Sequence, residues 1–104
     1  ANAIYKVFAD KVPVSATKPL TGHCLGAAAS IETALCCSLF SDNPEKFLLP
    51  HIYDGQYDET LPKIRLARKG EVVKRLEKVM CNAFGFGGTN AVIIIGREKW
   101  ETMI

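Results

Sequence analysis

The chain has 104 residues, of which 48% are hydrophobic and 23% charged, and its formal net charge is only +2. That length allows one small domain or part of one. The weak net charge excludes the strongly basic surface of a protein that binds nucleic acid or anionic membranes. A small-molecule or protein partner is therefore expected. The longest apolar run, residues 91–95, is too short to cross a bilayer, and the N-terminus lacks a signal-peptide layout, so we expect a soluble, cytoplasmic protein.

Two short elements are predicted at the start of the chain. Apolar side chains at positions 4, 5, 7 and 8 are typical of the last turns of an amphipathic helix over residues 4–9, whose beginning is missing. Residues 12–17 alternate apolar and small polar side chains, which predicts a strand. This strand ends in a loop at Lys18-Pro19, where proline breaks a strand ladder.

A long helix is predicted from Gly22 to about Phe40, with Thr21 or Gly22 as its cap. Alanine, leucine, isoleucine and cysteine occupy nearly every face of it, and Glu32 is its only charged residue. A helix that is apolar all round is a buried helix, and the few other elements here cannot cover it. We therefore expect part of the structure to lie outside this chain.

The remaining residues divide into a connection and two strands. Residues 45–70 contain two prolines and scattered charge, which indicates a surface connection with short extended pieces at 47–49 and 64–66. Residues 76–83 and 91–95 are strand-like, and the second run is continuously apolar, as expected of a strand covered on both faces. A glycine-rich turn, residues 84–90, joins them. This order of elements predicts an α/β fold.

The four cysteines, Cys24, Cys36, Cys37 and Cys81, form neither a C-x-x-C pair nor a disulfide framework, so we expect reduced thiols. Adjacent residues on a helix point in different directions, so Cys36 and Cys37 make a poor metal chelator, and a buried face is the better interpretation. We expect no metal and no cofactor.

Lys18, His23 and Glu32 stand out because the sequence around them is otherwise apolar and uncharged. An isolated charge in such surroundings must be paired or change its pKa. Glu32 follows His23 by nine residues, so its expected partner is Lys18, in a buried pair that braces the loop carrying His23. A plain structural ion pair is the compatible alternative.

If the long helix begins near Gly22, His23 lies in its first turn, where the positive end of the helix dipole disfavours imidazolium. A neutral histidine can donate a hydrogen bond to a reacting carbonyl or oxyanion. From these local features, a histidine that merely satisfies the helix start is an equally good interpretation.

The turn F-G-F-G-G-T, residues 84–89, lacks both the lysine-hydroxyl ending of a P-loop and the G-x-G-x-x-G order, and a strand follows it. We therefore reject a nucleotide site. Glycines let backbone N–H groups approach a ligand, and Phe84 and Phe86 can wall off an apolar pocket. A backbone oxyanion donor is the better interpretation.

Two segments carry a resemblance to a known family. Residues 15–28 read S-A-T-K-P-L-T-G-H-C-L-G-A-A, with Glu32 following, and residues 82–91 read N-A-F-G-F-G-G-T-N-A. They resemble the SATK-x-x-TGH-x-LGAA segment and the N-[SA]-FGFGGTN turn of type I and II β-ketoacyl-acyl-carrier-protein synthases, condensing enzymes of the thiolase superfamily. Both motifs are long and occur in the family's order, and with the residues between them they cover Val12 to Gly96.

The resemblance implies a fold and a reaction. Residues 1–104 would form the C-terminal portion of the second half of a thiolase-like α/β fold, with a mixed sheet and one buried helix. The full-length enzyme would catalyse the decarboxylating Claisen condensation of an acyl thioester with malonyl-acyl-carrier protein in fatty-acid biosynthesis. Its partners would be acyl carrier protein bearing the acyl and malonyl thioesters, the missing N-terminal half and, as a homodimer, a second copy. Neither nucleic acid nor a membrane is expected.

The same resemblance implies the roles of individual residues. His23 matches the second active-site histidine, which hydrogen-bonds the malonyl thioester carbonyl and stabilises its enolate as carbon dioxide leaves. Lys18 matches the active-site lysine and Glu32 its paired glutamate, which orient the site. The N–H of Phe86 matches an oxyanion-hole donor and its ring a gate of the acyl pocket, with Phe84 as its packing neighbour.

Some family features are absent from this sequence. No cysteine lies in the nucleophile's D-T-A-C-S context, since Cys24 occupies a variable position and Cys81 precedes the glycine turn. The H-G-T-x-T segment of the other active-site histidine is missing too, and His51 in the connection matches no family residue. We therefore expect this chain alone to be inactive.

Alternatives stay open at this point. The chain could be a non-catalytic or split subunit that completes or regulates a condensing-enzyme partner, or part of a polyketide ketosynthase. The loop from residue 63 to 77 is basic, and it is either a docking face for an acidic carrier protein or, as the better interpretation, a solvated charged face. Its basic residues are Lys63, Arg65, Arg68, Lys69, Lys74 and Arg75.

Overall fold

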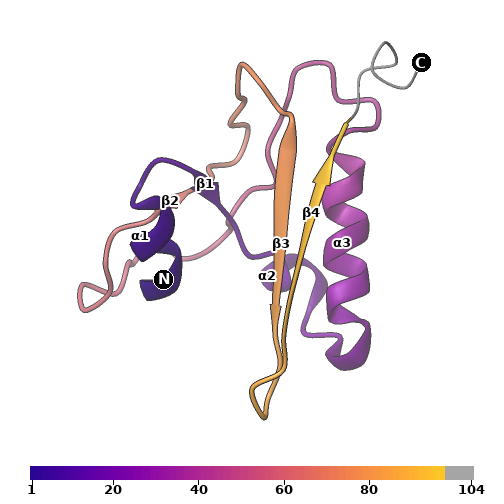
Figure 1. Ribbon diagram of the computed structural model, residues 1–104. Helices are drawn as coiled ribbons and strands as arrows, with labels where there is room; N and C mark the ends of the chain where they lie inside the picture. The colour runs from indigo at the N-terminus through magenta and orange to yellow at the C-terminus, as the bar shows by residue number, and fades with distance from the viewer. Residues whose placement is uncertain (98–104) are drawn as a thin grey trace. The chain divides into compact units, whose positions relative to one another are not determined.

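The computed structural model describes residues 1–97, which separate into two compact units (Figure 1). The first unit comprises Ala1–Gly22 and Leu48–Glu71. The second comprises residues 23–47 and the described residues from Val72 onward. Helices and short strands occur in both, so the α/β class predicted from the element order is confirmed.

The first unit begins with helix α1, Asn2–Phe8, which ends where the backbone of Ala9 turns to a φ of 53°. The helix predicted over residues 4–9 is thus confirmed apart from its last residue. Strand β1, Pro13–Val14, pairs in parallel with β2, Arg65–Leu66. Of the strand predicted over residues 12–17, only these two residues join a ladder, because a helix follows almost at once.

That helix, α2, spans Lys18–Thr21 and corrects the predicted loop at Lys18-Pro19. Proline is tolerated in the first turn of a helix, where its missing N–H would have no intrahelical acceptor. Thr17 is the N-cap residue, and its carbonyl accepts the N–H of Leu20 at 2.9 Å and of Thr21 at 3.1 Å. The helix ends at Gly22, whose φ of 78° favours glycine.

The second unit shows that the long helix predicted from Gly22 to Phe40 is wrong at its start. Residues 22–24 are not helical, Leu25–Ala27 form the 3-10 turn η1, and helix α3 spans Ala28–Ser38. The positive φ angles of Gly22, 78°, and Leu25, 50°, lie outside the right-handed helical region, so the helix cannot run through them. Ala27, rather than Thr21 or Gly22, is the N-cap residue of α3.

Strands β3, Lys78–Phe84, and β4, Asn90–Gly96, form an antiparallel hairpin whose register runs from Lys78 opposite Gly96 to Phe84 opposite Asn90. The two predicted strands and the turn between them are confirmed, with bounds shifted by one or two residues. Helix α3 lies alongside this hairpin (Figure 1), and the hydroxyl of Thr33 donates to the Cys81 sulfur at 3.9 Å.

One other fold expectation needs correction. The strands of residues 1–97 form two separate two-stranded sheets, one parallel and one antiparallel, in place of a single mixed sheet. Within these residues only Cys36 and Ala67 are buried hydrophobic side chains. Helix α3 and strand β4 are therefore not covered within this chain, which agrees with the expectation that its few elements cannot cover an apolar helix.

A membrane span was not expected, and none of the helices in residues 1–97 combines the length and the apolar character that one requires.

Candidate active site

The first motif is divided between the two units. Residues 15–22 belong to the first, and His23 opens the second. Lys18 is the first residue of α2, and its side chain is exposed in this chain by itself. Thr17, just before it, is only 7% exposed, and its hydroxyl has no hydrogen-bond partner among the described residues. The motif therefore presents Lys18 from a backbone that is anchored at Thr17.

His23 is exposed and lies between α2 and η1, in a stretch that is not helical. The prediction that it occupies the first turn of the long helix is wrong, because α3 begins at Ala28. His23 is therefore not placed at the positive end of the α3 dipole. Its catalytic role rests on the motif alone and stays a prediction.

Glu32 lies in α3 and is half-buried. Its predicted partner, Lys18, belongs to the other unit, so the pairing of the two stays a prediction. The expectation that both members are buried is wrong for this chain by itself, since the Lys18 side chain is exposed. An exposed lysine stays hydrated, so it does not incur the desolvation cost of a buried lysine.

The glycine turn is closed by its own backbone. The N–H of Gly85 donates to the Thr89 carbonyl at 2.7 Å, and Gly87 and Gly88 have φ angles of 85° and 91°. Phe86, at the tip, is 97% exposed, and its N–H makes no hydrogen bond within residues 1–97. The turn thus leaves this N–H open to a ligand, as an oxyanion donor requires.

The two phenylalanine rings of this turn wall off no pocket within the described residues, because Phe84 is 67% exposed and Phe86 almost completely so. The predicted gate and its packing neighbour are therefore not formed by this chain by itself. The role of both rings at an acyl pocket therefore stays a prediction.

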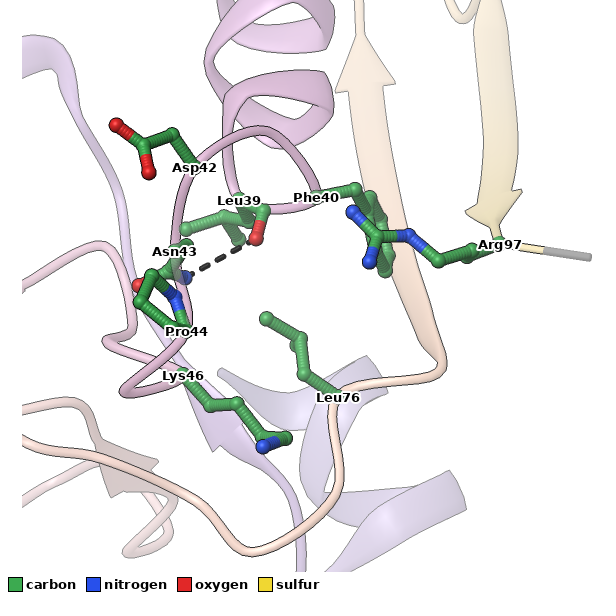
Figure 2. A pocket seen from close by; sticks show the side chains of 8 residues that line it. All are labelled: Leu39, Phe40, Asp42, Asn43, Pro44, Lys46, Leu76 and Arg97. Carbon is green, nitrogen blue, oxygen red and sulfur yellow. Dashed lines mark hydrogen bonds between the residues drawn. The ribbon is translucent and has the colours of Figure 1, made fainter. Parts of the chain in front are cut away.

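A cavity of about 270 Å³ lies in the second unit, and none of the residues predicted to be catalytic lines it. Figure 2 shows the Arg97 side chain, just after β4, reaching toward Phe40, while Leu76 extends into the same space from the segment before β3. The loop on its other side is held by Asn43, whose side-chain amide donates to the carbonyls of Leu39 and Phe47, both at 3.0 Å. This cavity adds nothing to the predicted chemistry.

The cysteines are free thiols, and Cys36 is buried against β3 while Cys37 is exposed. The prediction that both cysteines lie on a buried face is thus correct for Cys36 and wrong for Cys37. Burial raises the pKa of the Cys36 thiol to about 11, and the neighbouring Cys81 adds to this. Within residues 1–97 no group of three or more His, Cys, Asp or Glu side chains is arranged to hold a metal ion.

Two of the basic side chains in the loop are neutralised locally. Arg65 pairs with Glu71 at 2.8 Å, and Arg75 pairs with Glu77 at 2.5 Å. Both arginines are exposed, so these pairs contribute little to stability, but they reduce the net positive charge that an acidic partner would meet. This favours the solvated charged face.

His51, which matches no family residue, makes a contact that the sequence did not indicate. Its Nδ1 accepts the N–H of Ala16 at 3.1 Å, one residue before the buried Thr17. Its own N–H donates to the carbonyl of Ala67 at 2.8 Å, and its ring lies 5.0 Å from that of Tyr53. No local pattern in the connection signals this, because the contact joins residues 35 positions apart.

Comparison with known proteins identifies the class. The family model described as "Beta-ketoacyl synthase, C-terminal domain" matches residues 1–43, which include the S-A-T-K and T-G-H residues and Glu32. Together with the relatives below, this confirms the resemblance found in the sequence: the chain is similar to the C-terminal part of the β-ketoacyl synthases.

Several relatives carry a more particular name. The chain is 43% identical over 97 residues to 3-oxoacyl-[acyl-carrier-protein] synthase 1 of Haemophilus influenzae and 39% identical over 98 residues to that of Escherichia coli K12. It is 38% identical over 100 residues to 3-oxoacyl-[acyl-carrier-protein] synthase 2 of Coxiella burnetii. These matches cover 92–93% of this chain but only 23% of each relative. No solved structure matches the chain.

Proposed function

We propose that this chain is part of a 3-oxoacyl-[acyl-carrier-protein] synthase and lies in the C-terminal half of a thiolase-like fold. One observation carries the proposal. The similarity to synthases extends over 92% of the chain, and so includes both the segment with His23 and the turn with Phe86. The proposed catalytic residues come from both segments, and a shared fold alone would not require similarity in either of them.

In the proposed reaction, a cysteine elsewhere in the enzyme holds the acyl group as a thioester. Malonyl-acyl-carrier protein loses carbon dioxide, and the electron pair of the broken bond forms an enolate. A ring N–H of His23 donates to the enolate oxygen and stabilises the charge. The enolate carbon then attacks the acyl carbonyl carbon, and the cysteine leaves as a thiolate.

The Phe86 N–H acts at the second charged oxygen, the one that forms on the acyl carbonyl during the attack. Its lack of an acceptor within residues 1–97 supports this role, since an oxyanion donor must be unoccupied before the reaction. Lys18 and Glu32 orient the groups around His23. Acyl carrier protein delivers both thioesters, and the complete enzyme works as a homodimer.

The test uses the complete enzyme that contains this chain, and it measures carbon dioxide release from malonyl-acyl-carrier protein. His23→Ala removes a donor to the developing charge, so we expect the rate to fall by about 10²–10³-fold. Glu59→Gln, a substitution at an exposed residue outside both motifs, is the matched control and should retain the wild-type rate.

The same enzyme also tests the wider proposal. A wild-type protein that neither decarboxylates malonyl-acyl-carrier protein nor extends an acyl thioester would contradict it. The 104-residue chain by itself should be inactive, because none of its cysteines lies in the context of the nucleophile.

A further inference from the structure

We infer that His51 is a positioning residue for Lys18, because its ring holds the backbone of the S-A-T-K segment from which Lys18 extends. The inference rests on the proposed function, which supplies the role of Lys18. Every residue in the argument belongs to one compact unit, Ala1–Gly22 with Leu48–Glu71.

The link itself is the hydrogen bond from the Ala16 N–H to Nδ1 of His51, 3.1 Å long. The backbone N–H is the donor in this bond and the ring nitrogen is the acceptor. Strand β1 has already ended at Val14, so no ladder bond is available for Ala16. The histidine ring takes the place of the missing strand partner.

His51 is itself fixed to the backbone ladder. Its N–H donates to the carbonyl of Ala67 at 2.8 Å, and the N–H of Ala67 donates to the Val14 carbonyl at 2.9 Å. Ala67 is only 2% exposed, which makes it the most buried hydrophobic side chain among residues 1–97. The ring therefore acts from a rigid base, as a positioning group must.

The effect of the ring reaches Lys18 through two residues. Thr17, which follows Ala16, is buried and is the N-cap residue of α2. Lys18 is the first residue of that helix, and its carbonyl accepts the Gly22 N–H at 2.7 Å. Because α2 has only four residues, its direction depends on how its N-cap is held.

Two substitutions test the hydrogen-bond acceptor and the aromatic ring of His51 separately. His51→Asn places the amide oxygen where Nδ1 was but removes the ring, while His51→Phe keeps a ring beside Tyr53 but has no acceptor. Tyr53→Leu is the matched control, because it removes the ring contact and leaves the acceptor intact. All three are made in the complete enzyme, and thermal unfolding verifies that each is folded.

Two readouts are combined. Hydrogen exchange at the Ala16 amide should rise by about fivefold to tenfold in H51F, as loss of one hydrogen bond of ordinary strength predicts, and change less than twofold in H51N and Y53L. The kcat for decarboxylation of malonyl-acyl-carrier protein should fall by about tenfold in H51F with KM nearly unchanged, and H51N should restore most of it.

The outcomes separate the inference from the function on which it rests. If the wild type is active and H51F is equally active, His51 does not position Lys18, whatever the exchange result. If H51N is as impaired as H51F, or if Y53L has the same effect as H51F, the ring rather than the acceptor matters and the inference is again wrong. If the wild type has no decarboxylase activity, the proposed function itself fails.

Discussion

The two cysteines at positions 36 and 37 show how much the chemistry of a side chain depends on its direction. Cys36 faces β3 and is 8% exposed, while its neighbour Cys37 is exposed. Burial disfavours the thiolate of Cys36, and the neighbouring Cys81 would repel it further, so its pKa is raised from 9.0 to about 11. At neutral pH Cys36 is a protonated, unreactive thiol.

This shift predicts a pH dependence of stability. Because the folded state binds the Cys36 proton more tightly than the unfolded state, the stabilisation is complete below pH 9.0 and is lost as the pH rises toward about 11. The free energy of unfolding, from urea titrations between pH 8 and 11, should therefore fall more steeply in the wild type than in Cys36→Ala. Cys37→Ala is the matched control, and a slope like that of C36A would contradict the assignment.

At the scale of single elements, the glycine turn depends on backbone angles that other residues avoid. Gly88 has a φ of 91° although an added Cβ would meet nothing within 4 Å, so the cost of a side chain there is conformational rather than steric crowding by neighbours. Gly26 in η1 is equally open, but its φ is not positive. Both positions have room for a side chain, and they differ in the sign of φ.

This difference gives a matched pair of substitutions. Gly88→Ala should lower the free energy of unfolding by about 1–2 kcal/mol, the cost of a left-handed conformation, whereas Gly26→Ala should change it by less than about 1 kcal/mol or raise it. Urea unfolding of both variants measures this. An equal effect at the two positions would mean that the turn does not keep its positive φ angles.

The elements also show where sequence reasoning succeeds. The β3–β4 hairpin was predicted because a glycine-rich turn between two apolar runs is a strong local signal. The start of α3 was missed because composition suggested a continuous helix, while the backbone of Gly22 and Leu25 leaves the helical region. The site residues were named by motif matching, but His51 was not, because its contact with Ala16 depends on distant residues meeting in the fold.

For the molecule as a whole, the hairpin has a face whose apolar side chains are exposed among residues 1–97. Met80 lies opposite Ile94 in the register and Val92 is two residues away on the same face, with exposed fractions of 41%, 61% and 52%. A large exposed apolar patch marks an interaction surface. The chain spans only 23% of the length of its relatives, so in the proposed enzyme the remainder of the protein is the expected cover.

The isolated 104-residue chain should therefore bind a hydrophobic dye such as anilinonaphthalene sulfonate and associate at micromolar concentrations. Ile94→Lys places a charge in the middle of this face, so it should reduce dye fluorescence severalfold and keep the chain monomeric in analytical ultracentrifugation. Val7→Lys adds the same charge at a residue of α1 that is 73% exposed, outside the face, and should change neither measurement much. An equal effect of V7K would show that net charge, rather than this apolar face, governs the association. In the complete enzyme the same substitution should be harmful: I94K should lower the unfolding temperature by several degrees more than V7K, because there it would leave a lysine facing an apolar interface.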